Sequence, residues 1–177
     1  MATKPTIYKL NIAISDFNRD YYDSLQLITA LHPSETLERM MARILAYCLN
    51  AQENIAFGQG LSKVEEPDVW VKTLDDQITL WVDIGEPVPD RVKKSSRLAP
   101  EVKVYSFNSK SKVWWEQNKS KVAQFKNVKF YQFDWQQIQV LATFAARTMD
   151  WSLSISGDTL YIAADNQECE LLVTELI

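Results

Sequence analysis

The sequence predicts a mixed α/β protein, with a mixed β-sheet at its core and helices flanking the sheet. Three observations predict this fold class. Between residues 101 and 149, segments typical of strands alternate with segments typical of helices. Residues 67–84 alternate as two strands joined by a short acidic turn, and further strand pairs are expected at both ends of the chain. We therefore expect a single domain, residues 1–177, with additional β-hairpins beside the central sheet.

The N-terminal part is expected to form two strands and one helix. Residues 5–14 and about 20–31 alternate well enough to be an antiparallel strand pair. A helix from Ser34 to Leu49 follows, because apolar residues recur along it at spacings of four, three and four. These residues are Leu37, Met41, Ile44 and Cys48. Ser34 is the expected N-cap of this helix.

The C-terminal part alternates between helices and strands before it ends in strands. The expected elements are a helix over 89–99, a strand over 101–107, a helix over 110–123, a strand over 128–133 and a helix from Asp134 to about Met149. Asp134 with Gln137 resembles a capping box. A hairpin that turns at Gly157-Asp158 and a last strand over 168–174 complete the chain.

The predicted hairpin at residues 67–84 aligns two carboxylates. If its turn is centred on Asp75-Asp76, Asp68 faces Asp83 across the two strands. Side chains alternate along a strand, so these acids share one face, and the apolar side chains of the hairpin form the core face. Two like charges side by side destabilise a sheet unless a positive group lies between them. A divalent metal ion is the obvious candidate for that group.

A second interpretation of this hairpin needs no metal. Aspartate is common at strand ends, and Pro67-Asp68 could simply begin a strand. Asp75-Asp76 is not one of the favoured two-residue hairpin turns, so the register could slip by one residue. Such a slip would place the two carboxylates on opposite faces of the sheet.

Length and composition are those of an ordinary globular protein. The chain has 177 residues, of which 46% are hydrophobic and 24% charged. No apolar run approaches the ~18 residues that cross a membrane, and the N-terminus lacks the apolar segment of a signal peptide. Cys48 and Cys169 are far apart and are expected in packing positions, which favours a reduced, cytoplasmic compartment.

The net charge of −4 is unevenly distributed along the chain. Residues 89–129 contain eleven basic and three acidic side chains, a charge of +8 that leaves −12 for the remainder. The basic residues are Arg91, Lys93, Lys94, Arg97, Lys103, Lys110, Lys112, Lys119, Lys121, Lys126 and Lys129. Such a segment can bind the phosphate backbone of a nucleic acid, although solvated helix faces are the commoner explanation. Trp114-Trp115 could stack on bases or belong to the core.

Composition excludes several kinds of active site. His32 is the only histidine, so a histidine-rich zinc site is excluded, and no nucleophile-elbow motif is present. The four glycines form neither a phosphate-binding loop nor a dinucleotide fingerprint. Carboxylate and lysine chemistry remains, which suits Mg²⁺ and phosphate.

Glu38 is a further acidic candidate. On the expected 34–49 helix it lies about 90° from the apolar stripe, at the edge of the buried face. A carboxylate there could reach a neighbouring sheet edge, or it could be an ordinary boundary residue. Glu35, Arg39 and Arg43 are expected at the surface, where Glu35 and Arg39 would form a helix-stabilising pair.

Several motifs of this sequence resemble the YaeQ family of small bacterial proteins. They are His32-Pro-Ser-Glu-Thr-Leu-Glu-Arg-Met-Met41, Glu66-Pro-Asp68, Leu80-Trp-Val-Asp-Ile-Gly85, Arg91-Val-Lys-Lys94, Ser106-Phe-Asn-Ser109 and Trp114-Trp-Glu-Gln-Asn118. The likeness runs along essentially the whole chain, in the same order and spacing. That family resembles a compact variant of the PD-(D/E)XK nuclease superfamily, whose core is a mixed sheet flanked by helices. The resemblance therefore implies a nuclease-like fold.

The resemblance also implies a metal site. In that superfamily a helix glutamate, an aspartate and an acid-x-lysine segment surround one or two divalent metal ions. By position, Glu38 is the helix acid, Asp68 is the first aspartate and Asp83 is the second acid, which together would bind Mg²⁺. The lysine expected two residues after Asp83 is absent, because Gly85 stands there.

The function that the resemblance implies is metal-assisted hydrolysis of nucleic-acid phosphodiesters. Lys93 or Lys94, on the helix after the strand, could replace the missing lysine and orient the attacking water. The basic segment 89–129 would hold the phosphate backbone. Two other functions are open at this point: a nuclease-like module that binds nucleic acid or a protein partner in a regulatory role without cleavage, and a protein-interaction scaffold whose acids are structural.

Overall fold

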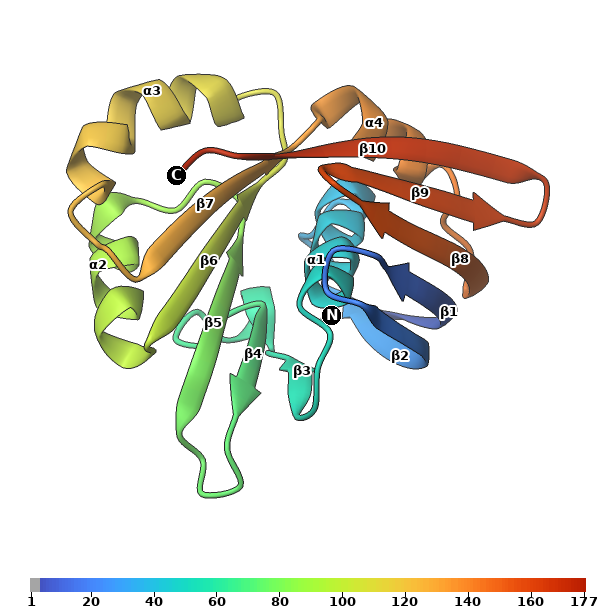
Figure 1. Ribbon diagram of the computed structural model, residues 1–177, viewed down its shortest axis with the longest axis horizontal. Coiled ribbons are helices and arrows are strands. Elements are labelled where there is room, and N and C mark those ends of the chain that lie inside the picture. The colour runs from blue at the N-terminus through green and yellow to red at the C-terminus, as the bar shows by residue number, and fades with distance from the viewer. Residues whose placement is uncertain (1–3) are drawn as a thin grey trace. The chain divides into compact units, whose positions relative to one another are not determined.

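The computed structural model describes residues 4–177 and has the mixed α/β fold that the sequence predicts (Figure 1). Its helices are α1 (Leu37–Leu49), α2 (Pro89–Leu98), α3 (Ser111–Val122) and α4 (Trp135–Ala142), together with the short 3-10 helix η1 (Gly60–Ser62). Its strands are β1 (Thr6–Asp16), β2 (Tyr21–Leu31), β3 (Ile55–Phe57), β4 (Val69–Lys72), β5 (Ile78–Ile84), β6 (Glu101–Ser106), β7 (Val128–Phe133), β8 (Thr148–Ser156), β9 (Thr159–Ala164) and β10 (Gln167–Glu175). Every predicted element is present, and β3 and η1 are additions.

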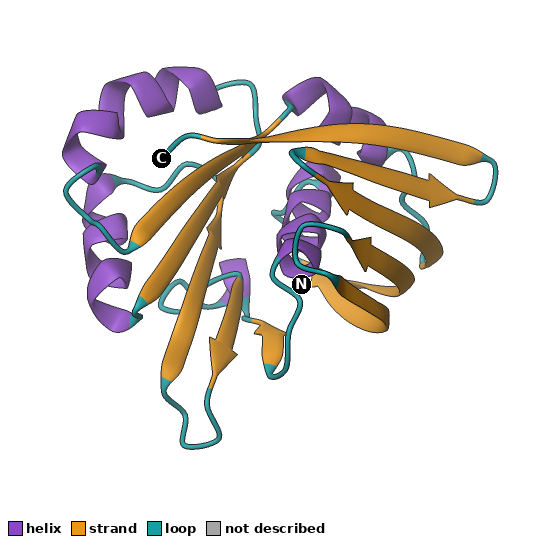
Figure 2. Ribbon diagram, viewed as in Figure 1, coloured by secondary structure: helices purple, strands orange, loops and turns teal. Residues whose placement is uncertain are grey.

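Contacts within the chain divide it into two compact units. The first consists of the residues up to Met41 and of Asp134–Val173, and the second of Ala42–Phe133 and Thr174–Ile177. Helix α1 and strand β10 each begin in the first unit and end in the second. Each unit combines strands with helical segments (Figure 2). The single domain expected for the whole chain stays a prediction.

The first unit contains five strands in the order β2-β1-β8-β9-β10. Strand β1 pairs antiparallel with β2 and parallel with β8, and β9 pairs antiparallel with both β8 and β10. The turn between β8 and β9 confirms the predicted hairpin, because Ser156 pairs with Thr159. Gly157 lies in this turn with a φ of +61°, a left-handed conformation that glycine adopts without strain.

Helix α4 is shorter than the sequence predicts. The N-cap is confirmed, because the Asp134 Oδ1 atom accepts a hydrogen bond of 2.9 Å from the Gln137 N–H. The capping box is not completed, because the Asp134 N–H donates to the Leu172 carbonyl and the Gln137 Oε1 atom accepts from the Leu172 N–H over 2.7 Å. The predicted extension to Met149 is wrong, since α4 ends at Ala142 and Met149 lies in β8. Met149 fits both a helical and a strand periodicity. From Thr148 onward buried and exposed residues alternate, and pairing with β1 and β9 makes the segment a strand.

Helix α1 begins at Leu37, three residues later than predicted. Ser34 is not its N-cap, because the Ser34 N–H donates to the His32 Nδ1 atom over 3.1 Å within a preceding turn. Thr36 caps the helix instead, and its hydroxyl oxygen accepts a hydrogen bond of 3.2 Å from the Arg39 N–H.

The expected surface positions on and before α1 are partly wrong. Arg43 is only 5% exposed and Glu35 is also buried. The predicted pair of Glu35 with Arg39 is confirmed, with 2.7 Å between Oε2 and Nη1. The Arg43 guanidinium lies 5.3 Å from the centre of the Phe57 ring. Apolar side chains of α1 are buried well beyond the single predicted stripe, so little of this helix faces solvent.

The second unit contains the strands β3 to β7, in sequence order across the sheet. Strands β3, β4 and β5 pair antiparallel, whereas β5, β6 and β7 pair parallel. The end of the chain runs beside β7, where the Leu176 N–H donates to the Phe130 carbonyl over 2.7 Å and the Phe130 N–H donates to the Ile177 carbonyl over 2.9 Å. This mixed pairing leaves β5 in the interior of the sheet.

Helices α2 and α3 lie along one face of this sheet, beside β5, β6 and β7 (Figure 1). Their apolar side chains form one core with those of the strands. This core contains Trp81, Val92, Ala99, Val102, Val104, Trp115, Val122, Val128 and Phe130. Trp114 packs against it, and its indole N–H donates to the Pro87 carbonyl over 3.0 Å. The two tryptophans therefore belong to the core and not to a stacking surface.

Candidate functional site

The two predicted acids lie opposite each other, as the register of the hairpin requires. Trp70 pairs with Trp81 and Val71 pairs with Leu80, which confirms the predicted alignment of β4 and β5. In this register Asp68, one residue before β4, faces Asp83 on β5. The turn itself is irregular, with a shift in register at the end of β4.

The face that carries the acids is buried, contrary to the expectation that only the opposite face belongs to the core. Asp68 is 4% exposed and Asp83 is 3% exposed. An interior strand with parallel pairing is usually covered on both faces, and α2 and α3 cover this one. Buried carboxylates need compensating partners, because desolvation of a charge is unfavourable.

Arg91 on α2 is the partner of Asp83. Its Nε atom lies 2.9 Å from Asp83 Oδ2 and its Nη2 atom lies 3.1 Å from Asp83 Oδ1. This two-pronged geometry is the strong form of the arginine–carboxylate pair. The guanidinium therefore places a positive charge beside the Asp83 carboxylate.

The same guanidinium holds the loop between β3 and β4. Arg91 Nη1 donates to the Val64 carbonyl over 2.7 Å, and Nη2 donates to the Glu66 carbonyl over 3.2 Å. The Glu66 side chain in turn accepts a hydrogen bond of 2.9 Å from the Gln59 N–H. We call residues 58–67 the arginine-bound loop, because Arg91 fastens it to α2.

Asp68 is fixed by the backbone around it. Its Oδ2 atom accepts a hydrogen bond of 2.8 Å from the Ile84 N–H, and its carbonyl accepts one of 2.9 Å from the Gly58 N–H. A Cβ atom at Gly58 would lie 2.0 Å from the Pro67 carbonyl oxygen, so only glycine fits there. At Gly60 a Cβ would lie 3.2 Å from Asp68 Oδ1. The arginine-bound loop therefore packs closely over this carboxylate.

Burial dominates the electrostatics of the acid pair. It raises the pKa of Asp83 above its usual value, while the hydrogen bonds and charge of Arg91 oppose this rise and the charge of Asp68 adds to it. Among the described residues, buried side-chain N or O atoms without a hydrogen-bond partner are found only in Trp81 and Trp151, and both are indole N–H donors. A donor cannot ligate a cation.

The predicted lysines do not take part in this cluster. Lys93 and Lys94 are exposed on α2. Neither makes an ion pair within the part of the chain that the structure describes. The basic side chain that reaches the acids is Arg91, two residues before Lys93 and about 200° away around the helix. From the sequence, Arg91 was expected only in the basic segment and in a family motif, and not as the partner of Asp83.

Glu38 lies in the first turn of α1 and is half-buried. It belongs to the first unit, whereas Asp68, Asp83 and Arg91 all belong to the second. Among residues 4–177, no three side chains of the histidine, cysteine, aspartate and glutamate types form a group that could hold a metal ion. The three-acid Mg²⁺ site stays a prediction.

A second polar cluster, which sequence analysis missed, joins the ends of β5 and β6. Glu86 follows β5 and accepts hydrogen bonds from Asn108 Nδ2 at 2.8 Å, from the Ser111 hydroxyl at 2.5 Å and from the Phe107 N–H at 3.3 Å. The signal for it was the position of these polar residues, just after neighbouring parallel strands. The cluster fixes the start of α3 to the sheet.

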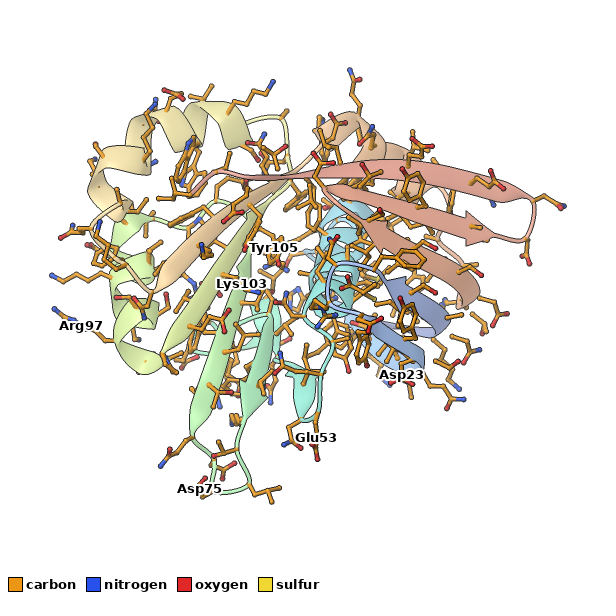
Figure 3. The ribbon with its side chains drawn as sticks, viewed as in Figure 1. Asp23, Glu53, Asp75, Arg97, Lys103 and Tyr105 are labelled. Atoms are coloured by element: carbon orange, nitrogen blue, oxygen red, sulfur yellow. The ribbon has the colours of Figure 1, made fainter. Side chains whose placement is uncertain are left out.

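Seven basic side chains on and beside α2 and α3 are exposed, and none has an ion-pair partner in the described part of the chain. We call them the basic helical surface: Lys93, Lys94, Arg97, Lys110, Lys112, Lys121 and Lys126. The labelled side chain of Arg97 points outward from α2 (Figure 3). Within residues 89–129, Asp90 is the one exposed acidic residue that makes no ion pair in the described part of the chain. This surface therefore carries a strong uncompensated positive charge.

The other four basic residues of the segment are engaged inside the second unit. Arg91 binds Asp83, Lys119 pairs with Glu116 over 2.8 Å, and Lys129 pairs with Glu175 over 3.3 Å. Lys103 extends from β6 on the face opposite α2 and α3, where its ammonium group donates to Asn50 Oδ1 over 2.7 Å. Figure 3 shows Lys103 and Tyr105 on this side of β6.

Comparison with known proteins identifies the family. The family model described as YaeQ protein matches residues 1–173. The chain belongs to the YaeQ family. The "Uncharacterized protein YaeQ" of Escherichia coli (strain K12) is 37% identical over 175 residues, which cover 98% of this chain and 97% of that protein. The protein of the same name from Salmonella typhi is also 37% identical over 175 residues, with the same coverage.

Solved structures of YaeQ proteins are similar over almost the whole chain. The crystal structure of YaeQ from Xanthomonas axonopodis pv. citri has a TM-score of 0.94 and 31% identity, and covers 97% of this chain and 98% of its own. That from Pseudomonas syringae has a TM-score of 0.93 and 34% identity, and covers 98% of this chain and 96% of its own. Among the described residues of this family member, no helix has the length and apolarity that a membrane-spanning segment needs.

The acid pair as arranged here does not fit a divalent metal ion. Both carboxylate oxygens of Asp83 accept hydrogen bonds from Arg91. One oxygen of Asp68 accepts from the backbone, and the nearest loop carbonyls also point at the guanidinium. Hard divalent cations need several free oxygen ligands. What this arrangement can do is hold the hairpin, α2 and the arginine-bound loop in one rigid cluster.

Proposed function

We propose that this YaeQ family member binds nucleic acid through its basic helical surface and does not cut it. The observation that carries the proposal is the set of seven exposed basic side chains without ion-pair partners in the described chain. A mixed sheet flanked by helices is also the core of the PD-(D/E)XK superfamily, so we propose a nuclease-like fold used as a binding module.

The chemistry of the surface favours phosphate over other anionic partners. Lysine and arginine that neutralise phosphates release condensed counterions, which supplies most of the affinity of non-specific binding. The two tryptophans of the segment are in or against the core, so base stacking by Trp114 or Trp115 does not contribute. We therefore propose recognition of the backbone of a duplex, without sequence preference.

Arg91 supports the proposal that the protein does not cut nucleic acid. Metal-assisted hydrolysis needs carboxylates that are free to bind the ion which activates water. Here the Asp83 carboxylate is held on both oxygens by the Arg91 guanidinium. Lys93 and Lys94, the two lysines expected beside the pair, are exposed on α2 and make no ion pair within residues 4–177.

One experiment separates binding from cutting. Labelled DNA and RNA, single-stranded and duplex, are incubated with the protein in EDTA, Mg²⁺ or Mn²⁺, and both binding and product formation are measured. We expect duplex binding that does not depend on the metal, with intact substrate throughout. No binding of any nucleic acid at low salt would contradict the proposal and favour a protein-interaction scaffold.

A second candidate function is metal-dependent cleavage, and the alignment of Asp68 with Asp83 on the hairpin favours it. It requires Arg91 to leave Asp83 before a metal ion binds. In the same experiment this function predicts products that need Mg²⁺ or Mn²⁺ and that disappear in Asp83→Ala. We expect no such products.

A further inference from the structure

We infer that this protein forms a two-fold dimer in which the edge strand β2 of one copy pairs antiparallel with β2 of a second copy. The two-fold axis passes through Leu25, so Tyr22 of one copy faces Ile28 of the other. This inference goes beyond the proposed function, because it concerns the first unit and not the basic helical surface.

Strand β2 is a long and regular edge strand. It spans eleven residues, Tyr21–Leu31, and pairs with β1 without a bulge, and among the described strands it has no neighbour on its other side. Natural edge strands are usually short, bulged or protected by lysine or proline, because unpaired N–H and C=O groups attract another strand. Strand β2 contains no lysine, arginine or proline, and Asp23 is its only charged residue. It therefore lacks the usual protection against pairing.

The direction of the backbone groups shows which residues of β2 can pair with another strand. Along a strand, the N–H and C=O groups of successive residues point to opposite sides. In and just after β1, the Lys9 and Phe17 N–H groups donate toward β8, to the Arg147 and Ile155 carbonyls, each over 2.9 Å. The even-numbered residues of β1 therefore bond to β2, where their partners are odd-numbered. The even-numbered residues of β2 consequently direct their N–H and C=O groups to the open edge.

Four exposed residues of β2 have backbone groups available at this edge: Tyr22, Ser24, Gln26 and Ile28. Within residues 4–177, no hydrogen bond engages the outward backbone groups of Tyr22, Gln26 or Ile28. The Ser24 N–H donates to the exposed Asp23 carboxylate of its own chain over 2.8 Å, a contact that a carbonyl of another strand can replace. The open edge therefore offers four successive outward-pointing residues.

Only one register uses all four of these residues. With the axis at Leu25, Tyr22 pairs with Ile28 and Ser24 with Gln26, with two main-chain hydrogen bonds in each pair. An axis at Gln26 would need Ala30, which already has a partner. An axis at Ser24 would need Asp20, whose φ of +54° lies outside the strand region.

The exposed side chains of β2 are self-complementary in this register. Tyr22 is 54% exposed and Ile28 is 66% exposed, and they lie on the same face at equal distances from the axis. An aromatic side chain therefore packs against a β-branched one at both ends of the pairing, which is a favourable cross-strand pair. Phe17 extends the aromatic end, with its ring centre 5.9 Å from that of Tyr22. Asp23 faces Leu27 and not the Asp23 of the second copy, so like charges do not meet.

Sedimentation velocity in EDTA, without nucleic acid, measures the dimer. We expect the wild type to be dimeric at micromolar concentrations. Gln26→Pro removes one outward N–H per chain but keeps the bonds of β2 to β1, so it should remove two interchain hydrogen bonds and weaken the dimer about 30-fold. Ile28→Lys places a charge against Tyr22 and should also weaken it. Val140→Lys, at a 50% exposed position on α4 in the same unit, is the matched control and should not.

Cysteine cross-linking tests the register. The Cα atoms of a non-hydrogen-bonded antiparallel pair are about 4.5 Å apart, within the range that a disulfide spans. Leu25→Cys should therefore cross-link two chains under mild oxidation. The two thiols of Asp23→Cys would lie about 14 Å apart and should not cross-link. The native Cys48 and Cys169 are buried.

Any of four results would overturn the inference: a wild type that is monomeric throughout the micromolar range, a dimer that a folded Gln26→Pro or Ile28→Lys leaves unchanged, a loss in Val140→Lys as large as that in Ile28→Lys, or cross-linking of Asp23→Cys that equals that of Leu25→Cys. If Gln26→Pro fails to fold, Ile28→Lys at its exposed position decides alone. Nucleic acid is absent from these measurements, so a monomeric wild type leaves the proposed function standing, and a failure to bind a duplex leaves the dimer standing.

Discussion

Neutralising part of the basic helical surface should lower the salt dependence of duplex binding by a defined amount. The variant is the triple Lys93→Gln, Lys94→Gln and Arg97→Gln, which removes three of the seven exposed basic groups. Each phosphate contact contributes about 0.9 to the slope of log affinity against log salt, so seven contacts give about −6.3 and four give about −3.6. Between 50 and 200 mM salt, the wild type should then lose roughly 6,000-fold in affinity and the variant about 150-fold.

Fluorescence anisotropy of a labelled DNA duplex in EDTA measures both slopes. The matched control is Lys4→Gln, Lys9→Gln and Arg147→Gln, which removes two exposed lysines and one exposed arginine from the first unit. The control should keep the slope of the wild type. If the two triple variants have the same slope, duplex binding depends only on the net charge of the protein. The basic helical surface would then not be the site that contacts the phosphates.

Three further predictions concern stability and ionisation. Phe130 is fully buried in the core under α2 and α3, so Phe130→Ala should lower the free energy of unfolding by about 3–5 kcal/mol in urea; a loss below about 1 kcal/mol would contradict this packing. Burial raises the pKa of Asp83 above its ordinary 3.8, so the native state keeps this proton to higher pH than the unfolded state. The free energy of unfolding should therefore fall as the pH rises from 3.8 through the raised pKa, and Asp83→Asn should remove this part of the slope; an unchanged slope would refute the assignment. Burial, followed by the charges of Glu175 and Glu101, raises the pKa of Tyr131 to about 12, so Tyr131→Phe should remove a phenol that titrates near 12 in ultraviolet absorbance. Loss of a phenol that titrates near 10 would contradict this prediction.

Local patterns were enough to predict most of the fold. The register that sets Trp70 opposite Trp81 follows from alternation along two short strands and from the position of their turn, which are both local features. Strand β3 was missed because three residues, Ile55–Phe57, are too few to show a period. The end of α4 was misplaced because Met149 fits both a helical and a strand spacing, and only pairing with distant strands decides between them.

The candidate site was predictable only in part, for the same reason. Asp68 and Asp83 lie on one hairpin, so their alignment could be read from the sequence. The partner of Asp83 could not be read from the sequence, because it depends on how α2 is rotated over the sheet. That rotation turns Arg91 inward and leaves Lys93 and Lys94 exposed.

The measurement that tests the central claim most directly is cleavage of a duplex that the protein has been shown to bind in EDTA. After Mg²⁺ or Mn²⁺ is added, the account predicts that the bound duplex stays intact, for the wild type and for Asp83→Ala alike. Metal-dependent products from the wild type that are absent with Asp83→Ala would contradict it, because they would mean that a metal ion, and not Arg91, serves the acid pair.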